Sequence, residues 1–202
     1  MSLPDLVRAN LDVVFVGINP SSFSVAQGHY FARKTNRFWP CFSASKLSLK
    51  AREATGLTRF EPVHDRDLLD HGFGFTDAVK RASPRASDIS PAEFCAGVET
   101  LLTKLHRFRP KVACFHGIMA YRPVHRALTL SRTEPVLGAQ SLRIGATRLY
   151  LVPNPSPANA HFTASDQTKW YDQLDLFLRQ LSIIKQSAKS SPPQNDASAN
   201  SV

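Results

Sequence analysis

The 202-residue chain is poor in cysteine and has no two cysteines at the spacing of a metal site. Cys41, Cys95 and Cys114 are far apart, have apolar neighbours and form no C-x-x-C motif, which argues against a zinc site or an iron–sulfur cluster. The seven histidines are scattered too, and His64 and His71, which could share a helical face, have no close second ligand. We therefore expect buried free thiols and no metal.

Long apolar runs are also missing. The chain has no stretch of about 18 uninterrupted apolar residues that could span a bilayer. Its opening Met-Ser-Leu-Pro-Asp has neither the basic segment nor the apolar run of a secretory signal. We expect an intracellular, soluble protein with no membrane partner, located in the nucleus if the source is a eukaryote and otherwise in the cytoplasm or nucleoid.

The apolar content of 43% is enough for one substantial core, which we assign to a single domain over residues 1–184. The segment that follows, KQSAKSSPPQNDASANSV (185–202), has almost no apolar residues. It cannot bury enough surface to offset the entropy of ordering, so we expect a disordered C-terminal tail.

Phosphate-binding glycine motifs are absent, since the chain contains neither G-x-G-x-x-G nor G-K-[ST]. No nucleotide cofactor is therefore expected, and no other cofactor is indicated. A net charge of +9 and a pI near 9.8 instead favour a polyanionic partner, because lysine and arginine release counterions when they meet phosphates. The basic residues form three groups, each of which could equally be solvated surface: Arg33, Lys34 and Arg37; Lys80, Arg81 and Arg85; Lys104, Arg107, Arg109 and Lys111.

The hydrophobic period changes several times between strand-like and helix-like, which is typical of an α/β fold with a parallel sheet covered by helices. Strands are predicted at 12–17, within HGFGFTDAV (71–79), at 111–117, and as a pair at 141–145 and 147–153. Helices are predicted after a cap at Asn36, over 64–71, over about 91–107, in a segment that Pro123 interrupts or kinks, and from about Thr163 to Leu181.

Asparagine–proline turns follow two of the predicted strands. GINPSS (17–22) ends the first strand and PNPSP (153–157) ends the last. Loops at the carboxyl ends of parallel strands commonly form a ligand site, and the prolines fix the local backbone. Asn-Pro is also a common turn dipeptide, so either turn alone could be structural. The two together, with the basic charge, favour a binding site.

Six blocks of the chain match a known family in the same order. They are GINP (17–20), GHYFARKTNRFW (28–39), GFGFTDAVKR (72–81), the capped helix after ASDIS (86–90), VACFHG (112–117) and PNPS (153–156). Over residues 13–181 the sequence thereby resembles the mismatch-specific uracil/thymine DNA glycosylases of the uracil-DNA glycosylase superfamily.

The resemblance implies a three-layer α/β sandwich around a mostly parallel, four- to five-stranded sheet. It also implies a monomer that needs no cofactor and acts on double-stranded DNA containing a damaged or mismatched base. Such monofunctional DNA glycosylases flip the base out and excise it by water attack at the deoxyribose, which leaves an abasic site for base excision repair. Uracil is the expected substrate, with thymine and other damaged pyrimidines, especially in G mismatches, as further candidates.

Two residues fall at positions that the resemblance links to catalysis. Asn19 occupies the position of the amide that orients the water, and because an uncharged amide is no strong base, turnover should be slow. Asp77 occupies a position that varies in the family, where a carboxylate facing the pocket would polarise the water or stabilise a cation-like sugar. It could equally be an aspartate that caps a helix after Thr76.

The resemblance also assigns a base pocket. Phe31 would stack on the flipped base, worth about 1–3 kcal/mol in comparable stacking, although a core phenylalanine is the alternative. The backbone N–H groups of Ile18 and Phe31 would meet the base carbonyls, and Asn36 would support the loop or read the base edge. The hydroxyl of Ser24 would crowd the methyl group of thymine and so favour uracil, by about 1–3 kcal/mol for one methyl group. The assigned positions are Gly17, Ile18, Ser24, Tyr30, Phe31 and Asn36.

The loop after the last strand corresponds to the family's wedge into the base stack. Ala158 stands where leucine or arginine is expected and would be a poor plug, unless His161 or Phe162 fills the gap, so the preference for the opposite base is expected to be relaxed. Asn154 replaces the histidine of faster branches and supplies no proton. Ser21 replaces the usual glycine after GINP, and no lysine stands at the motif to support a lyase step. The assigned loop residues are Asn154, Pro155, Ser156, Pro157, Ala158 and Asn159.

Two other function classes remain open. The first is a catalytically weak DNA-damage-binding module of the same fold, which the presence of Asn19 and Phe31 disfavours. The second is a small-molecule nucleosidase or nucleotide-binding enzyme, which cleavage of free nucleosides or salt-insensitive nucleotide binding would favour.

Overall fold

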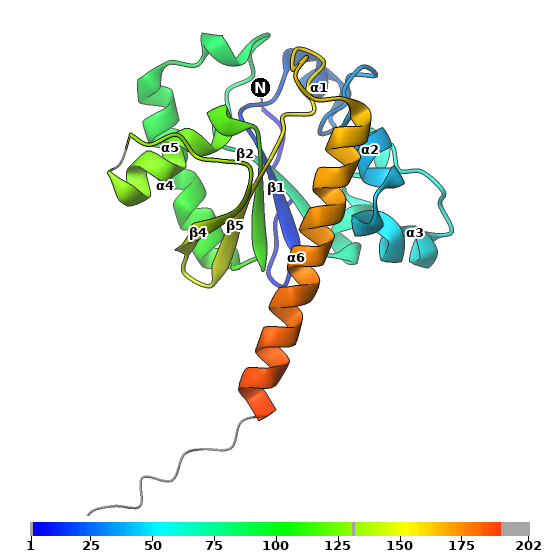
Figure 1. Cartoon of the computed structure of the whole chain (residues 1–202). Helices are drawn as coiled ribbons and strands as arrows, with labels where there is room; N and C mark the ends of the chain where they lie inside the picture. The colour runs from blue at the N-terminus through cyan, green and yellow to red at the C-terminus, as the bar shows by residue number, and fades with distance from the viewer. Residues whose placement is uncertain (1, 131, 191–202) are drawn as a thin grey trace, which may run out of the picture.

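The structure is a computed structural model that describes residues 2–130 and 132–190. Its centre is a five-stranded sheet in the order β2-β1-β3-β5-β4 (Figure 1). Four strands are parallel, and β4 pairs antiparallel with β5 at one edge. The strands are β1 (Val13–Gly17), β2 (Phe73–Asp77), β3 (Val112–His116), β4 (Gly138–Ile144) and β5 (Thr147–Val152). The predicted α/β fold with a mostly parallel sheet is thereby confirmed.

Helices cover both faces of the sheet and complete the three expected layers (Figure 1). One face packs against α2, α3 and α6, and the other packs against α4 and α5. The helices are α1 (Ser22–Gln27), α2 (Phe38–Ala44), α3 (Leu49–Thr55), α4 (Pro91–Phe108), α5 (Ile118–Thr129) and α6 (Ala164–Ser190). Short 3-10 turns occupy Lys46–Ser48, Pro62–His64, Asp67–His71 and Ala86–Asp88.

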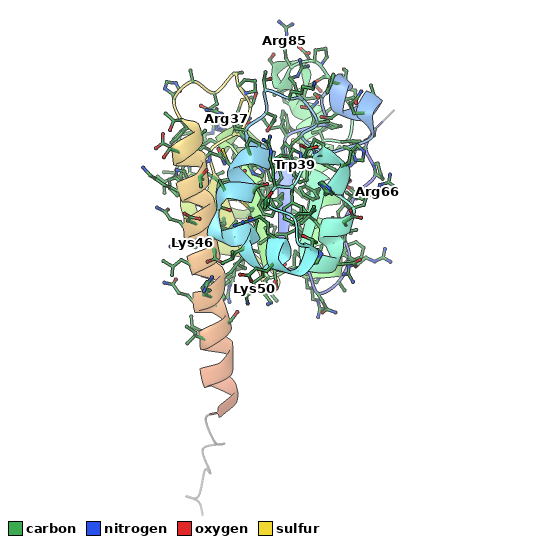
Figure 2. The ribbon with its side chains drawn as sticks, turned by 90° about the vertical axis from the view of Figure 1, so that its right-hand side faces the viewer. Arg37, Trp39, Lys46, Lys50, Arg66 and Arg85 are labelled. Atoms are coloured by element: carbon green, nitrogen blue, oxygen red, sulfur yellow. The ribbon has the colours of Figure 1, made fainter. Side chains whose placement is uncertain are left out.

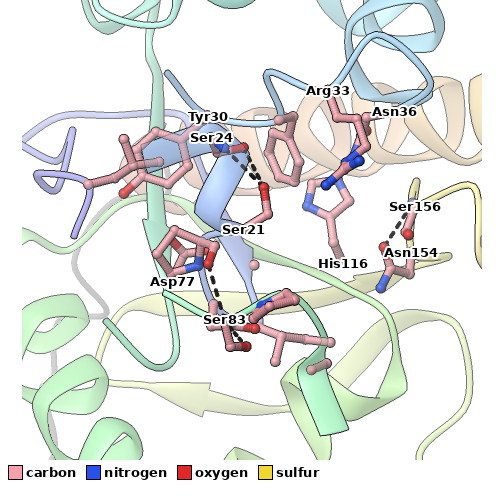
Figure 3. A pocket seen from close by; sticks show the side chains of 18 of the residues that line it. Ser21, Ser24, Tyr30, Arg33, Asn36, Asp77, Ser83, His116, Asn154 and Ser156 are labelled. Atoms are coloured by element: carbon pink, nitrogen blue, oxygen red, sulfur yellow. Dashed lines mark hydrogen bonds between the residues drawn. The ribbon is translucent and has the colours of Figure 1, made fainter. Parts of the chain in front are cut away.

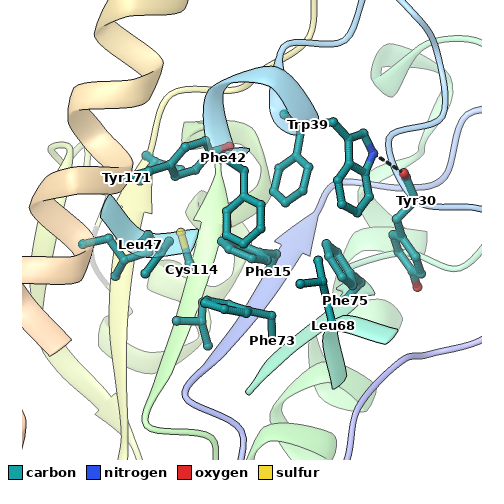
Figure 4. Close-up of a cluster of buried hydrophobic side chains, with 14 of the residues drawn as sticks. Phe15, Tyr30, Trp39, Phe42, Leu47, Leu68, Phe73, Phe75, Cys114 and Tyr171 are labelled. Carbon is teal, nitrogen blue, oxygen red and sulfur yellow. Dashed lines mark hydrogen bonds between the residues drawn. The ribbon is translucent and has the colours of Figure 1, made fainter. Parts of the chain in front are cut away.

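Strand β1 is buried along its whole length because both of its faces meet helices. Val13 and Phe15 belong to the hydrophobic cluster under α2, α3 and α6, whereas Val14 and Val16 belong to the cluster under α4 and α5. Phe15 lies in the middle of an aromatic group, with its ring centre 5.7 Å from that of Phe42 (Figure 4). This packing fixes the strand whose carboxyl end carries the Asn-Pro turn.

The N-terminal segment extends the edge of the sheet beside β2. Leu6 and Phe75 exchange two backbone hydrogen bonds of 2.9 and 2.8 Å. Leu3 is buried in the aromatic cluster, and the hydroxyl of Tyr30 donates to the carbonyl of Pro4 at 3.0 Å. Leu3 is therefore part of the core, and the backbone of residues 4–6 is bonded to the folded domain.

Some local predictions differ from the structure. Residues 64–71 fall into two 3-10 turns instead of one helix, because Asp65 at their junction turns its carboxylate inward to accept the N–H of Tyr30 at 2.9 Å. Helix α5 runs through Pro123 without a break, since burial of Tyr121 and Val124 outweighs the lost backbone hydrogen bond. Helices α1 and α3 were not predicted, because each is only two turns long and lacks a clear apolar period.

The structure also differs from the predictions in the exposure of one cysteine and in the length of the last helix. Cys41 and Cys114 are buried as predicted, but Cys95 is exposed because it lies beside, and not within, the buried stripe of α4. Helix α6 continues to Ser190, past residue 184, where we expected the folded domain to end. Residues 191–202 of the expected tail lie outside the described residues.

Candidate active site

A cavity of about 470 Å³ opens at the carboxyl ends of β1, β2, β3 and β5 (Figure 3). Most of the predicted site residues share this cavity, whereas Pro155, Ala158 and Asn159 do not line it. The predicted residues that line it are Gly17, Ile18, Asn19, Ser24, Tyr30, Phe31, Asn36, Asp77, Asn154, Ser156 and Pro157.

The side chain of Asn19 is held by its amide nitrogen. This atom donates to the carbonyl oxygens of Pro20 and Arg81, both at 3.2 Å, and to Ser83 Oγ at 2.8 Å. Carbonyl oxygens only accept hydrogen bonds, so the atom beside them must be the nitrogen of the amide. The amide oxygen accepts nothing from the described residues and is left to accept a hydrogen bond from a water molecule in the cavity.

Asp77 ends β2 with a side chain that is only 5% exposed. Its Oδ2 has no hydrogen-bond partner among the described residues, and burial raises the pKa of the carboxyl group to about 7. No helix begins after Thr76, because the N–H groups of Ala78 and Val79 instead donate to the carbonyls of Gly17 and Ile18 at the end of β1, at 2.9 Å each. The helix-cap interpretation of Asp77 is therefore wrong, and its carboxyl group lines the cavity.

Charged groups surround Asp77 at longer range. Lys80 and Lys104 both reach Asp5, with Nζ–Oδ distances of 2.9 and 2.6 Å. The two lysines lower the pKa of Asp77 and Asp5 raises it, but desolvation is the largest influence. Gly17 lies directly against the carboxyl group, since a Cβ at Gly17 would be 2.4 Å from Asp77 Oδ1. Only glycine fits there without moving Asp77.

His116 ends β3 and was missed from the sequence. It lines the cavity, is buried, and places its ring centre 5.2 Å from that of Phe31 (Figure 3). Its Nε2 lies 2.9 Å from the hydroxyl of Tyr171 in α6, and burial lowers the pKa of the imidazole to about 3. The ring is therefore neutral at physiological pH and cannot be a strong acid or base. The sequence signal that could have found His116 is its position as a polar residue at the end of a predicted strand.

Ring packing and hydrogen bonds hold the loop that carries Phe31 in place. Phe31 has a positive φ of 52°, which is uncommon outside glycine, and its ring stacks on Phe38 at 4.4 Å. The Oγ of Ser24 accepts the N–H of Ala32 at 3.3 Å. Asn36 Oδ1 accepts the N–H of Phe38 at 2.9 Å, which leaves the amide nitrogen of Asn36 for another partner. The N-cap of α2 is Arg37, one residue after the predicted Asn36, and it makes no side-chain cap bond.

The loop after β5 folds on itself. Asn154 Oδ1 accepts the N–H of Ser156 at 2.9 Å, and the side chain of Asn159 donates to the carbonyl of Asn154 at 3.0 Å. Gly117 follows β3 with a φ of +92°, and a Cβ there would be 3.0 Å from Cβ of Asn154. Ala158 is exposed at the tip of the loop. Arg37, which we had counted with the surface cations, binds the backbone of this loop.

Many of the predicted basic groups are paired with acidic side chains. Arg81 forms a two-pronged ion pair with Glu93, which lowers the pKa of Glu93 to about 2. The described salt bridges also include Arg85–Asp88 at 3.4 Å and Lys111–Asp12 at 2.6 Å. Arg33 lines the cavity, and within the described residues neither it nor Lys34 forms a salt bridge. Arg85 projects from the same end of the molecule (Figure 2).

The described part of the chain contains no group of three or more His, Cys, Asp or Glu side chains arranged to hold a metal ion. Among the same residues, no helix combines the length and apolar character that crossing a bilayer requires.

Comparisons with known proteins agree with this architecture. Residues 4–178 match the model of the Uracil DNA glycosylase superfamily. The structure is similar to the solution NMR structure of a candidate uracil DNA glycosylase from Methanosarcina acetivorans. The two chains are 20% identical, with a TM-score of 0.50, and the match covers 86% of this chain and 97% of the other. At this identity the likeness concerns the fold.

Proposed function

The chain belongs to the uracil DNA glycosylase superfamily, and we propose that it is a monofunctional DNA glycosylase of the mismatch-specific branch. In this proposal the protein acts as a monomer on duplex DNA, flips uracil out of the helix and hydrolyses its bond to deoxyribose. Thymine and other damaged pyrimidines, especially opposite guanine, are further substrates. The product is an abasic site.

The orientation of Asn19 carries the proposal. Its amide nitrogen lies within hydrogen-bond distance of three acceptors, so the side chain of this cavity-lining residue is held in place and its amide oxygen has no donor among the described residues. A water molecule that donates to this oxygen would have a lone pair free for the anomeric carbon. Because the base leaves ahead of the attacking water, the water needs orientation more than deprotonation, which is what a rigid neutral amide supplies.

Asp77 supports the same chemistry from the neighbouring strand. A carboxylate in a buried site stabilises the positive charge that develops on the sugar, and the effect is larger there than in water. With a pKa of about 7, the group is ionised in part of the molecules at neutral pH and in most of them above it. We expect base excision to increase with pH through this range.

The other cavity residues would hold the base. Phe31 offers a stacking surface backed by Phe38. No hydrogen bond among the described residues uses the backbone N–H groups of Ile18 and Phe31, so both are free to meet base carbonyls. The amide nitrogen of Asn36 would read the base edge, and Ser24, which is buried on the cavity wall, would disfavour a methyl group at C5.

The test compares duplexes that carry uracil, thymine, hypoxanthine or an exocyclic cytosine adduct, treated with protein and then with alkali. Strand breaks at uracil are expected with the wild-type protein, and their absence at every lesion would refute the glycosylase proposal. Binding to the lesion without breaks would instead favour the alternative, a DNA-damage-binding module of the same fold.

Single-turnover excision by Asn19→Ala and Asp77→Ala separates the two roles. We expect Asn19→Ala to lower the rate by about 100-fold, a typical cost of removing one preorganised polar group. Asp77→Ala should lower it less and remove the increase with pH. If Asp77→Ala leaves the rate unchanged, Asp77 takes no part in the mechanism.

A further inference from the structure

The side chain of Arg37 contacts four backbone carbonyls of the loop after β5, which we call the 154–162 loop. Its Nη2 donates to the carbonyl oxygens of Ser156 at 2.9 Å and of Asn159 at 2.7 Å, and its Nη1 donates to that of Phe162. Its Nε makes a longer contact of 3.5 Å with the carbonyl of Pro155. The backbone N–H of Arg37 donates to that same carbonyl at 3.0 Å.

We propose that Arg37 is a positioning residue that holds the 154–162 loop in the shape needed to keep duplex DNA open, and that it does not bind a phosphate. The proposal rests on the proposed glycosylase function. A guanidinium has five N–H donors, and four of them already point at loop carbonyls, so little donor capacity remains for a phosphate.

The loop needs such support because its own hydrogen bonds are few. Pro155 and Pro157 have no N–H, and the internal bonds reach only from Asn154 to Asn159. Among the hydrogen bonds of the described residues, the carbonyl oxygens of Asn159 and Phe162 accept only from the side chain of Arg37. Bonds from a charged donor are stronger than neutral ones, so one guanidinium can order several residues of the loop at once.

Arg37 also joins the loop to the base pocket through the chain itself. Its neighbour Asn36 lines the cavity, and its other neighbour Phe38 backs the ring of Phe31. The same three residues therefore set the position of the stacking ring and of the loop. A base can be held in the pocket only if the loop stands at the correct distance from it.

This role predicts a dependence on DNA structure. In a duplex the flipped base leaves a gap between stacked neighbours, and the 154–162 loop has to hold that gap open. A single strand has no complementary strand and little stacking to restore, so the position of the loop matters less. Loss of Arg37 should therefore affect duplex substrates selectively.

The test uses Arg37→Gln and Arg37→Lys, with Arg33→Gln as the matched control. Arg33 lies four residues away, carries the same charge and lines the cavity mouth without a salt bridge among the described residues. Single-turnover excision of uracil is measured on duplex and on single-stranded DNA at several salt concentrations. Urea unfolding of each variant shows whether the fold is retained.

Arg37→Gln is expected to lower the duplex rate by about 10- to 100-fold, the range expected for lost charge-assisted hydrogen bonds, and to change the single-strand rate less than about twofold. Arg37→Lys should recover little, because an ammonium group cannot reach the same carbonyls. Arg33→Gln should lower the duplex and single-strand excision rates by similar factors. The slope of the logarithm of the DNA-binding constant against the logarithm of salt concentration should become about one unit shallower. Equal loss of both rates in Arg37→Gln, or a weaker salt dependence, would overturn the proposal.

A second measurement does not depend on catalysis. Hydrogen exchange of the free protein reports the Asn159 amide, which donates to the carbonyl of Ser156 at 3.0 Å. Faster exchange in Arg37→Gln supports the positioning role, and unchanged exchange overturns it. If the wild-type protein releases no base from any lesion, the glycosylase proposal fails while this measurement still decides the role of Arg37.

Discussion

Replacing Asp77 with asparagine should make the protein more stable at alkaline pH. Burial raises the pKa of the native carboxyl group to about 7, from an ordinary value of 3.8. Because the folded pKa is the higher one, this group costs the native state nothing below about pH 4. The cost grows as the pH increases from about 4 to about 7 and is constant above that. Asparagine has no such cost because it stays uncharged.

The magnitude follows from the width of this window. Each pH unit is worth about 1.4 kcal/mol, and between pH 5 and pH 8 only the two units below the folded pKa contribute. The free energy of unfolding of Asp77→Asn, relative to that of the wild type, should therefore increase by about 3 kcal/mol from pH 5 to pH 8. Lys80, Lys104 and Asp5, which influence the same carboxyl group, remain in both proteins.

Urea unfolding of both proteins at pH 5, 6, 7 and 8 measures the difference. Asp70→Asn is the matched control, because it makes the same chemical change at a side chain that is 82% exposed and so involves no buried carboxyl group. A stability difference between Asp77→Asn and the wild type that stays within about 1 kcal/mol over the whole range would show that the carboxyl group is not buried as described.

Two further substitutions test the support of the catalytic groups. Gly17→Ala places a Cβ 2.4 Å from the Asp77 carboxyl oxygen, so single-turnover excision is expected to fall at least about tenfold, and a wild-type rate would show that the contact relaxes freely. Ser83→Ala removes the shortest of three bonds to Asn19 and should lower the excision rate by about 3- to 10-fold, with a loss of about 1 kcal/mol in urea unfolding. An unchanged excision rate in Ser83→Ala, with or without a loss of stability, would contradict an orienting role for Ser83.

The fold was predictable because its main signals are local. The buried strands 13–17 and 112–116 are apolar apart from His116 at the end of the second, and α4 begins with a capping box whose bonds the structure contains. The short helices α1 and α3 were missed because tertiary packing, and not an apolar period, stabilises them.

The candidate site was predictable only where residues stand in motifs at strand ends. Asn19, Asp77 and Phe31 meet in one cavity because β1, β2 and the following loops converge there. Ser83 and Arg37 could not be found in this way. Their partners are 64 and about 120 residues away in the chain, so only the folded backbone brings them together.

The placement of the N-terminal segment has a practical consequence. Leu3 is part of the cavity wall, and Asp5 is the carboxylate that Lys80 and Lys104 share. Trimming the chain to residue 7 would leave two cations behind Asp77 without their shared anion and would expose the backbone edge of Phe75. Affinity tags and immobilisation chemistry therefore belong at the opposite terminus, where α6 leads away from the cavity (Figure 1).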